Sequence, residues 1–543
     1  MATGRRGALA RRRRALGLSQ QDLADKVRVD ARTVGRWERG ESDPQPWQLP
    51  GLARALGLTL DELDRHLVPR DQYPAIASLG ADSHHLTDAP RFGSVSAAGN
   101  VAFRISADGD VVAQIDRRTV LVATASAVAF LADFPVDGAL VPARPVLPWT
   151  SDAFGTMLSE RWPGAAAVEA APQPGGAEWQ LLLPSGRSMP GTSAAVRLVS
   201  AVPRGERAAL ELADARETEG FVRRVGRGFI VAALEDESRY FLLDARTARS
   251  RLQGGHDTVA IPYGFELDDL TFGIVWAVAN LDDALLSDDR ALDDARHDLM
   301  AYEQLTSSSV GRESAPDLNP IAHMYLGSDF CARFIMRGLP ALGAPPVAWT
   351  KEQRGEEAST WLLFDHKYRY LRETVSMVGG SMDRGFCIPT SAVATSPRYE
   401  RVLLFLAIAL MESLGIRVYL TTDASYASVE GFVIAPEHHK AIIADWVGGE
   451  GMWHVDLIGK SNSVGSFEEV AVDVTAQSII EAASPARRLS ALADYLELDR
   501  AWLSRRCAEI GTQGTSSLIQ SRSRLISSAG LDTACRYVGS LRL

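Results

Sequence analysis

"LSQQDLADKVRVDARTVGRWERG" spans Leu18–Gly40, and its cap and turn residues divide it into two short helices. Ser19 is a good N-cap, so a helix is predicted over 20–27. The three residues "RVD" form a turn that ends at Asp30, the next N-cap. "ARTVGRWER" then predicts a second helix over 31–39, which Gly40 ends as a C′ glycine. The stretch therefore indicates a helical hairpin with a tight turn.

Apolar residues at helical spacing predict a small core around this hairpin. Basic and amphipathic segments on either side, "RRGALARRRRALG", "PWQLPGLARALG" and "TLDELDRHL", add a first, a fourth and a fifth helix. Arg32, Thr33 and Arg36 then point away from the core, which leaves a cationic face of the kind that a major groove accepts. The expected core consists of Leu16, Leu18, Leu23, Val27, Val34, Trp37, Leu52, Leu56, Leu58 and Leu63.

The opening segment resembles the Cro/CI-type (XRE) helix-turn-helix family over residues 7–67. The matching motifs are "LGLSQQDLADKV", "TVGRWERG" and "P…LARALGLTLDEL", in the family's order and spacing. The resemblance implies an all-α, five-helix domain that binds double-stranded DNA, usually as a dimer on half-sites about one helical turn apart. The alternative is a helical hairpin that contacts another protein.

The resemblance also implies roles for individual residues. Gln20 would bond a phosphate and brace the recognition helix. Base-facing positions would fall on Ala31, Arg32, Gly35 and Arg36. Thr33 and Arg39 would contact the DNA backbone. Ala31 and Gly35 differ from the polar side chains that usually contact bases at these positions, so few direct base contacts are expected. The arginines would carry most of the guanine recognition.

Charge is unevenly distributed along the 543 residues. Residues 1–70 carry 14 Lys/Arg and 9 Asp/Glu, a net charge of +5, while the whole chain has a net charge of −11. A protein that coats nucleic acid over its whole surface is therefore excluded, and DNA contact is expected at the front. Four cysteines without a CxxC pair argue against a zinc ribbon or a disulfide framework, and suit a cytoplasmic protein.

The chain is too long for one core, so a multidomain α+β protein is predicted. The "SADGD" turn predicts a β-hairpin within the second domain. The apolar run at Arg117–Ala132 is too short to span a bilayer and predicts a buried strand or helix, so no membrane is expected. The expected segments are a helix-turn-helix domain at 1–70, a linker at 71–100, a mixed, mostly β domain at 101–260, a helical segment at 261–345, an α/β domain at 346–470 and a helical C-terminal region at 471–543.

Three features of the later segments carry further expectations. The Asp-Asp pairs at 282–283, 288–289 and 293–294 are predicted to lie on a solvated helix face, because their spacing fits no metal motif. Residues 346–470 predict an α/β sandwich. "GFCIPTSAV" is expected to be a strand that runs into a loop, and a buried helix and four strands are expected to follow it. The tail from Gln520 to Leu543 is expected to contact a partner subunit.

One catalytic pattern stands out, "HHKAIIAD". His438, Lys440 and Asp445 are similar to the HxKx4D motif of the phospholipase D superfamily, in which the histidine attacks a phosphodiester and the lysine holds the phosphate. The resemblance of 384–462 to that fold is partial. A single motif is present where two are needed per active site, so a homodimer would have to supply the second. The alternatives are a surface turn or an inactive relative.

No Walker loop, dinucleotide-binding glycine motif, GxSxG elbow or HExxH motif occurs, so no cofactor and no metal is expected. The leading interpretation is a cytoplasmic, sequence-specific transcription regulator with a large ligand-sensing or dimerising body, a homodimer on double-stranded DNA that responds to an unidentified small-molecule effector. The second is a phosphodiesterase directed to DNA by the same reader. The third is a toxin–antitoxin-like or scaffold protein whose reader regulates its own gene.

Overall fold

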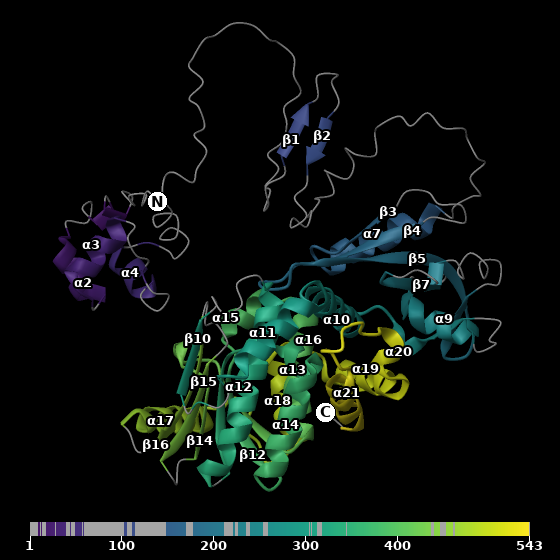
Figure 1. The fold of residues 1–543 in the computed structure, drawn as a ribbon. Helices are drawn as coiled ribbons and strands as arrows, with labels where there is room; N and C mark the ends of the chain where they lie inside the picture. Colours follow the sequence, from purple (N-terminus) through teal and green to yellow (C-terminus); the bar gives the residue numbers. More distant parts are fainter. Residues whose placement is uncertain are drawn as a thin grey trace, which may run out of the picture. The chain divides into compact units, whose positions relative to one another are not determined.

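The chain forms two compact units in a computed structural model, residues 1–96 and residues 97–543, referred to below as the N-terminal unit and the body (Figure 1). Each unit is described by itself. The structure describes residues 9–10, 12–13, 18–27, 29–39, 44, 49–56, 58, 102–105, 111–114, 148–169, 178–210, 221–222, 226–234, 239–253, 259–302, 305, 307–311, 318–343, 345–435, 439–445, 452–459 and 462–541.

The N-terminal unit is helical, as its spacing predicts. Helices α2 (Gln20–Val27), α3 (Ala31–Arg39) and α4 (Leu49–Leu56) follow a helical stretch around Leu9. Six of the predicted core residues are buried, and Leu18 and Leu58 are partly buried, which confirms the expected packing for these positions. Leu16, Leu63 and the predicted fifth helix lie outside the described residues. The buried core consists of Leu9, Leu23, Ala24, Val27, Val34, Trp37, Leu52, Ala53 and Leu56.

In the body, β1 (Ala102–Ile105) and β2 (Val111–Gln114) form an antiparallel pair on either side of "SADGD", as the predicted hairpin requires. The residues of "SADGD" themselves lie outside the described residues. The predicted linker at 71–100 and the apolar run at 117–132 lie outside the described residues.

A mixed sheet follows in the order β3-β4-β5-β6-β9, and β7 pairs with both β5 and β8. Neighbours are antiparallel except β5 and β7, which run parallel. β7 is buried along its whole length, as its apolar sequence "GFIVAAL" predicts. The bounds are α7 (Pro148–Arg161), β3 (Ala166–Glu169), β4 (Glu178–Leu183), β5 (Thr192–Pro203), β6 (Arg207–Leu210), β7 (Gly228–Leu234), β8 (Arg239–Asp244), α9 (Ala245–Gln253) and β9 (Ala260–Pro262).

The second sheet has the order β10-β16-β15-β14-β11-β12-β13, in which β11, β12 and β13 are parallel and the other pairs antiparallel. The four strands predicted after the buried helix are present. "GFCIPTSAV" differs from its prediction, since a short helix, α15, follows the strand. The bounds are β10 (Ser307–Gly311), β11 (Val347–Glu352), β12 (Met382–Cys387), α15 (Thr390–Thr395), β13 (Ile416–Thr421), β14 (Phe432–Ala435), β15 (Lys440–Asp445) and β16 (Met452–Gly459).

Helices cover both faces of this second sheet, as an α/β sandwich requires. Trp349, Tyr419 and Phe432 project from one face toward α17 (Asn462–Ala476) and form a separate apolar cluster with it. The other face packs against α12 (Pro320–Leu342) and its neighbours (Figure 1). Those neighbours are α13 (Gly355–Leu363), α14 (Asp365–Met377) and α16 (Arg398–Ser413).

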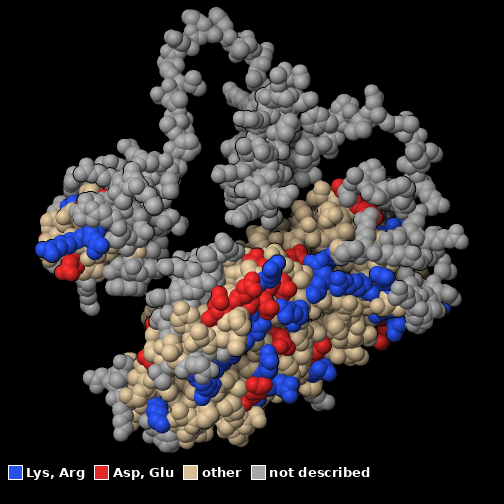
Figure 2. Space-filling model, viewed as in Figure 1, with Lys and Arg blue, Asp and Glu red and all other residues tan. Residues whose placement is uncertain are grey.

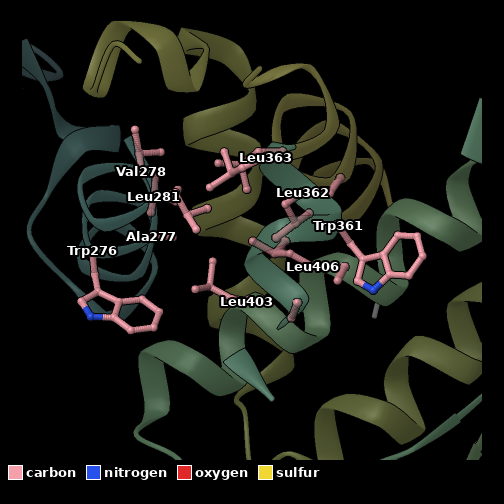
Figure 3. Close-up of a cluster of buried hydrophobic side chains, with 14 of the residues drawn as sticks. Trp276, Ala277, Val278, Leu281, Trp361, Leu362, Leu363, Leu403 and Leu406 are labelled. Carbon is pink, nitrogen blue, oxygen red and sulfur yellow. The ribbon is translucent and has the colours of Figure 1, made fainter. Parts of the chain in front are cut away.

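The centre of the body is a helical core shared by residues far apart in the chain. Figure 3 shows Trp276, Leu362 and Leu403 among side chains that come from α10 (Asp269–Ser287), α13 and α16. One continuous cluster of buried side chains extends from Phe154 to Val538. The segments predicted separately from 101 onward therefore share one core. α10 is long and apolar enough to cross a membrane by length and composition, and 83% of that window is buried inside the body.

The Asp-Asp pairs differ from their prediction. Leu285, Leu292 and Leu299 are buried as expected, but Asp282 is fully buried as well. It accepts hydrogen bonds from the backbone N–H groups of Arg522 (2.7 Å) and Ser523 (2.6 Å), and it pairs with the Arg227 guanidinium. Buried carboxylates persist where such donors satisfy them. The expectation of a solvated face was wrong for this residue, because its partners lie far away in the sequence.

The C-terminal region is helical, as predicted, and its described tail packs within its own chain. Arg506 donates to Asp268 at 2.6 Å in a buried ion pair, and Arg522 pairs with Asp283. α21 packs on α16 and α19. These contacts bury part of the C-terminal region within its own chain, and contact of the tail with a partner subunit stays a prediction. The helices are α11 (Asp289–Leu299), α18 (Pro485–Tyr495), α19 (Arg500–Gln513), α20 (Thr515–Leu518) and α21 (Ala529–Ser540).

Candidate nucleic-acid interface

Reciprocal capping begins α2. The Ser19 hydroxyl oxygen accepts from the Asp22 N–H at 3.0 Å, and the Asp22 carboxylate accepts from the Ser19 N–H at 2.7 Å. Two backbone donors that the first turn leaves unpaired are thereby satisfied. These hydrogen bonds also lower the pKa of Asp22. The predicted N-cap at Ser19 is confirmed.

A tight turn separates α2 from α3. The Val29 N–H donates to the Ala24 carbonyl at 3.0 Å, which closes the end of α2. The Val34 N–H donates to the Asp30 carbonyl at 3.3 Å, which starts α3. Val27, Val34 and Trp37 fill the angle between the helices, so the buried side of α3 is fixed against α2.

A buried ion pair holds α3 on its core-facing side. The Arg13 Nε donates to Glu38 Oε1 at 2.6 Å, and its Nη2 donates to Glu38 Oε2 at 3.1 Å. Arg13 also donates to the Leu18 carbonyl at 2.7 Å. Both charged side chains are less than a tenth exposed. Glu38 therefore joins the first helical stretch, the start of α2 and the end of α3.

The predicted DNA-binding residues fall into groups. Arg32 and Arg36 are exposed on α3, on the side away from the core. Ala31 and Thr33 are half-buried, and Gly35 is buried. Arg39 is helical, but its side chain lies outside the described residues.

Gln20 is half-buried, and its side-chain amide donates to Glu38 Oε2 at 2.7 Å. This hydrogen bond ties the first residue of α2 to α3, the bracing contact that the resemblance implies. Lys26 is exposed near the end of α2 and adds a further cation to the unit. Figure 2 shows an exposed Lys/Arg area on the N-terminal unit. Such an area supplies the charge that phosphates require.

Sequence reasoning missed Arg13 and Glu38. A signal for Glu38 was available, because it lies four residues after the buried Val34, on the apolar side of α3. A carboxylate at such a position requires a buried partner. Arg13 carries no such signal, since it is one of four consecutive arginines.

Comparison with known proteins identifies a family for the N-terminal unit alone. Residues 9–63 match the helix-turn-helix family. This helix-turn-helix segment is of the XRE type, and it indicates a DNA-binding regulator. No curated protein and no solved structure matches the chain. The phospholipase D-like resemblance is without support from these comparisons.

The residues of the HxKx4D pattern are only partly described by the structure. His438 and the Asp445 side chain lie outside the described residues. Lys440 is exposed on β15, and its ammonium donates to the Ala341 carbonyl at 2.6 Å. His439 Nδ1 lies 3.0 Å from a Glu468 oxygen. In the part of the chain that the structure describes, no group of three or more His, Cys, Asp or Glu could hold a metal ion.

Proposed function

We propose that the protein is a cytoplasmic transcription regulator that binds double-stranded DNA in a sequence-specific way, with α3 in the major groove. The observation that carries this proposal is the contrast between the two sides of α3. One side is locked by Val34, Trp37 and the Arg13–Glu38 pair, while Arg32 and Arg36 are exposed on the other. A rigid helix with outward-facing arginines can place a guanidinium against guanine O6 and N7.

The proposal includes a division of labour between the two units. One helix-turn-helix contacts only a short half-site, so tight binding requires two helix-turn-helix units held about one helical turn apart. The body, the larger unit with one continuous core, would supply the homodimer contact that sets this spacing. A small-molecule effector bound to the body would act by favouring one spacing over another.

Selection from a random library of duplex DNA tests the proposal. The full-length protein is incubated with the library at a fixed salt concentration, and the bound fraction is sequenced. The expected result is one enriched motif, repeated at a spacing of about one helical turn. Sedimentation of the free protein should show a dimer. A library without enrichment would contradict sequence-specific binding, and a monomer that binds DNA no more tightly than residues 1–70 would contradict the dimer.

A further inference from the structure

A small cavity lies in the body between α12, α13, α14 and the second sheet. Its volume is about 50 Å³, and its lining includes polar side chains from α12, α14, β11 and β12, and the indole of Trp361 from α13. A water needs ~10–15 Å³ of such volume, so roughly three to five water-sized groups fit. The lining residues used below are Ser328, Thr350, Lys367, Tyr370 and Arg384.

Arg384 brings a buried charge to this cavity from β12. Its residue is 3% exposed, and its Nη1 and Nη2 donate to the hydroxyls of Thr350 (2.8 Å) and Tyr370 (3.1 Å). Its Nε is buried without a hydrogen-bond partner among the described residues. Both acceptors are neutral, so the hydrogen bonds leave the guanidinium charge uncompensated. A buried arginine is ordinarily paired with an anion.

Lys367 brings a second buried cation from α14. It is 2% exposed, and its ammonium donates to the Thr360 hydroxyl at 2.7 Å. The same indole ring, that of Trp361, lies 4.5 Å from the Lys367 ammonium and 5.1 Å from the Arg384 guanidinium. Burial lowers the pKa of Lys367, the Glu357 carboxylate opposes this shift, and the Arg384 charge adds to it.

Arg384 is the buried cation whose printed hydrogen-bond partners are all neutral and whose Nε has no partner among the described residues. The Glu357 carboxylate acts on Lys367, where it opposes the fall in the pKa of that amine. A bound anion would accept from the Arg384 Nε and compensate the guanidinium charge in a medium of low dielectric constant.

We propose that this cavity binds a small organic or inorganic anion, whose carboxylate or phosphate group lies against the Arg384 guanidinium. The volume limits the ligand to an acid of a few heavy atoms. The Ser328 hydroxyl, which also bonds His366 Nε2 at 2.8 Å, lines the α12 side and supplies a further polar contact. The ligand would join α12 and α14 to the sheet. Its role as an effector rests on the proposed regulatory function, whereas the binding itself does not.

Calorimetric titration of the full-length protein without DNA tests the site. Sodium acetate, sodium pyruvate and inorganic phosphate are titrated at constant ionic strength in chloride, beside neutral acetamide. Saturable binding of a carboxylate or of phosphate, and none of acetamide, is expected, and the preferred anion identifies the ligand class. Absence of binding by all three anions, or equal binding of acetamide, would overturn the proposal. Because no DNA is present, a failure to find an operator leaves this result unaffected.

Two variants locate the binding. Arg384→Gln removes the charge and should weaken the bound anion at least about tenfold, as expected for loss of a charge-assisted hydrogen bond. Ala332→Leu keeps Arg384 and Lys367 but fills space beside the cavity, and should also abolish anion binding. This second variant tests the site even if Arg384→Gln does not fold. Arg372→Gln, at an exposed position of α14, is the matched control and should bind as wild type does. Unchanged binding by the folded variants at 384 or 332 would overturn the assignment.

Discussion

Arg13 and Glu38 form a two-pronged ion pair inside the N-terminal unit, with Nε–Oε1 and Nη2–Oε2 distances of 2.6 and 3.1 Å. The pair lies on the core-facing side of α3 and orients this helix, which carries the exposed arginines. Removal of one partner of such a pair leaves the other charge buried and unpaired, which is the costly outcome.

Glu38→Ala should therefore destabilise residues 1–70 by about 3–5 kcal/mol, enough to unfold much of so small a unit. Urea unfolding followed by tryptophan fluorescence measures the change, since Trp37 is buried in this core. Lys26→Ala, at an exposed position of α2, is the control and should change stability by less than about 0.5 kcal/mol. Equal stabilities for the two variants would show that the ion pair does not hold α3.

Asp282 has the corresponding role in the body. It accepts from two backbone N–H groups of the tail and pairs with Arg227. In Asp282→Asn, an amide N–H₂ would face these donors, and the Arg227 charge would lose its partner. We expect a loss of about 3–5 kcal/mol in the free energy of unfolding, measured by chemical denaturation. Asp294→Asn, at an exposed position of α11, should change little, and a similar loss in both variants would contradict this account.

The sequence predicted those elements whose information is local. Ser19 and the spacing of Leu23, Val27, Val34 and Trp37 define the helix-turn-helix within twenty residues. The strands and the buried helix of the second sheet were likewise predictable, because apolar runs between turn residues record burial directly.

The buried charges were not predictable, because each depends on a partner that is distant in sequence. Asp282 is satisfied by Ser523, 241 residues later. Lys367 has one local signal, since it precedes the buried Tyr370 and Leu371 by three and four residues on α14. Arg384 shares one face of β12 with the buried Met382 and Phe386, but nothing nearby marks it as lining a cavity. Spacing alone reports which side of an element is buried, not what a buried cation contacts.

Glu400 makes the stability of the body depend on pH. Burial, together with the Glu356 and Glu357 charges, raises its pKa from 4.5 to about 7. Below pH 4.5 the side chain is protonated in both folded and unfolded states. Between pH 4.5 and about 7 the folded state keeps a proton that the unfolded state releases, so its contribution to stability falls as the pH rises, by up to about 3 kcal/mol.

Glu400→Gln removes this dependence. The free energy of unfolding of the variant minus that of the wild type should rise between pH 4.5 and 7 and then level off, measured by denaturant titration at each pH. Glu373→Gln, at an exposed position of α14, should show no such rise. A flat difference for the Glu400 variant across this range would contradict the raised pKa.

The HxKx4D pattern is predicted to be non-catalytic. Hydrolysis by this route needs one histidine as nucleophile and another as acid for the leaving oxygen, and one motif supplies one. Lys440 already donates to the Ala341 carbonyl. Purified protein in EDTA should cleave neither plasmid DNA nor bis-p-nitrophenyl phosphate, and His438→Ala should behave identically. Cleavage by the wild type that disappears in the variant would establish the phosphodiesterase instead.

Arg36→Ala tests the central claim most directly. The variant is titrated, beside the wild type and the body variant Arg249→Ala, against the selected operator and against a scrambled duplex at the same salt concentration. Arg36 is exposed on α3, so its loss should weaken operator binding by about 1–3 kcal/mol and leave binding to the scrambled duplex nearly unchanged, while Arg249→Ala matches the wild type. Equal losses on both duplexes would assign Arg36 to phosphate contact, and unchanged operator binding would contradict recognition by α3.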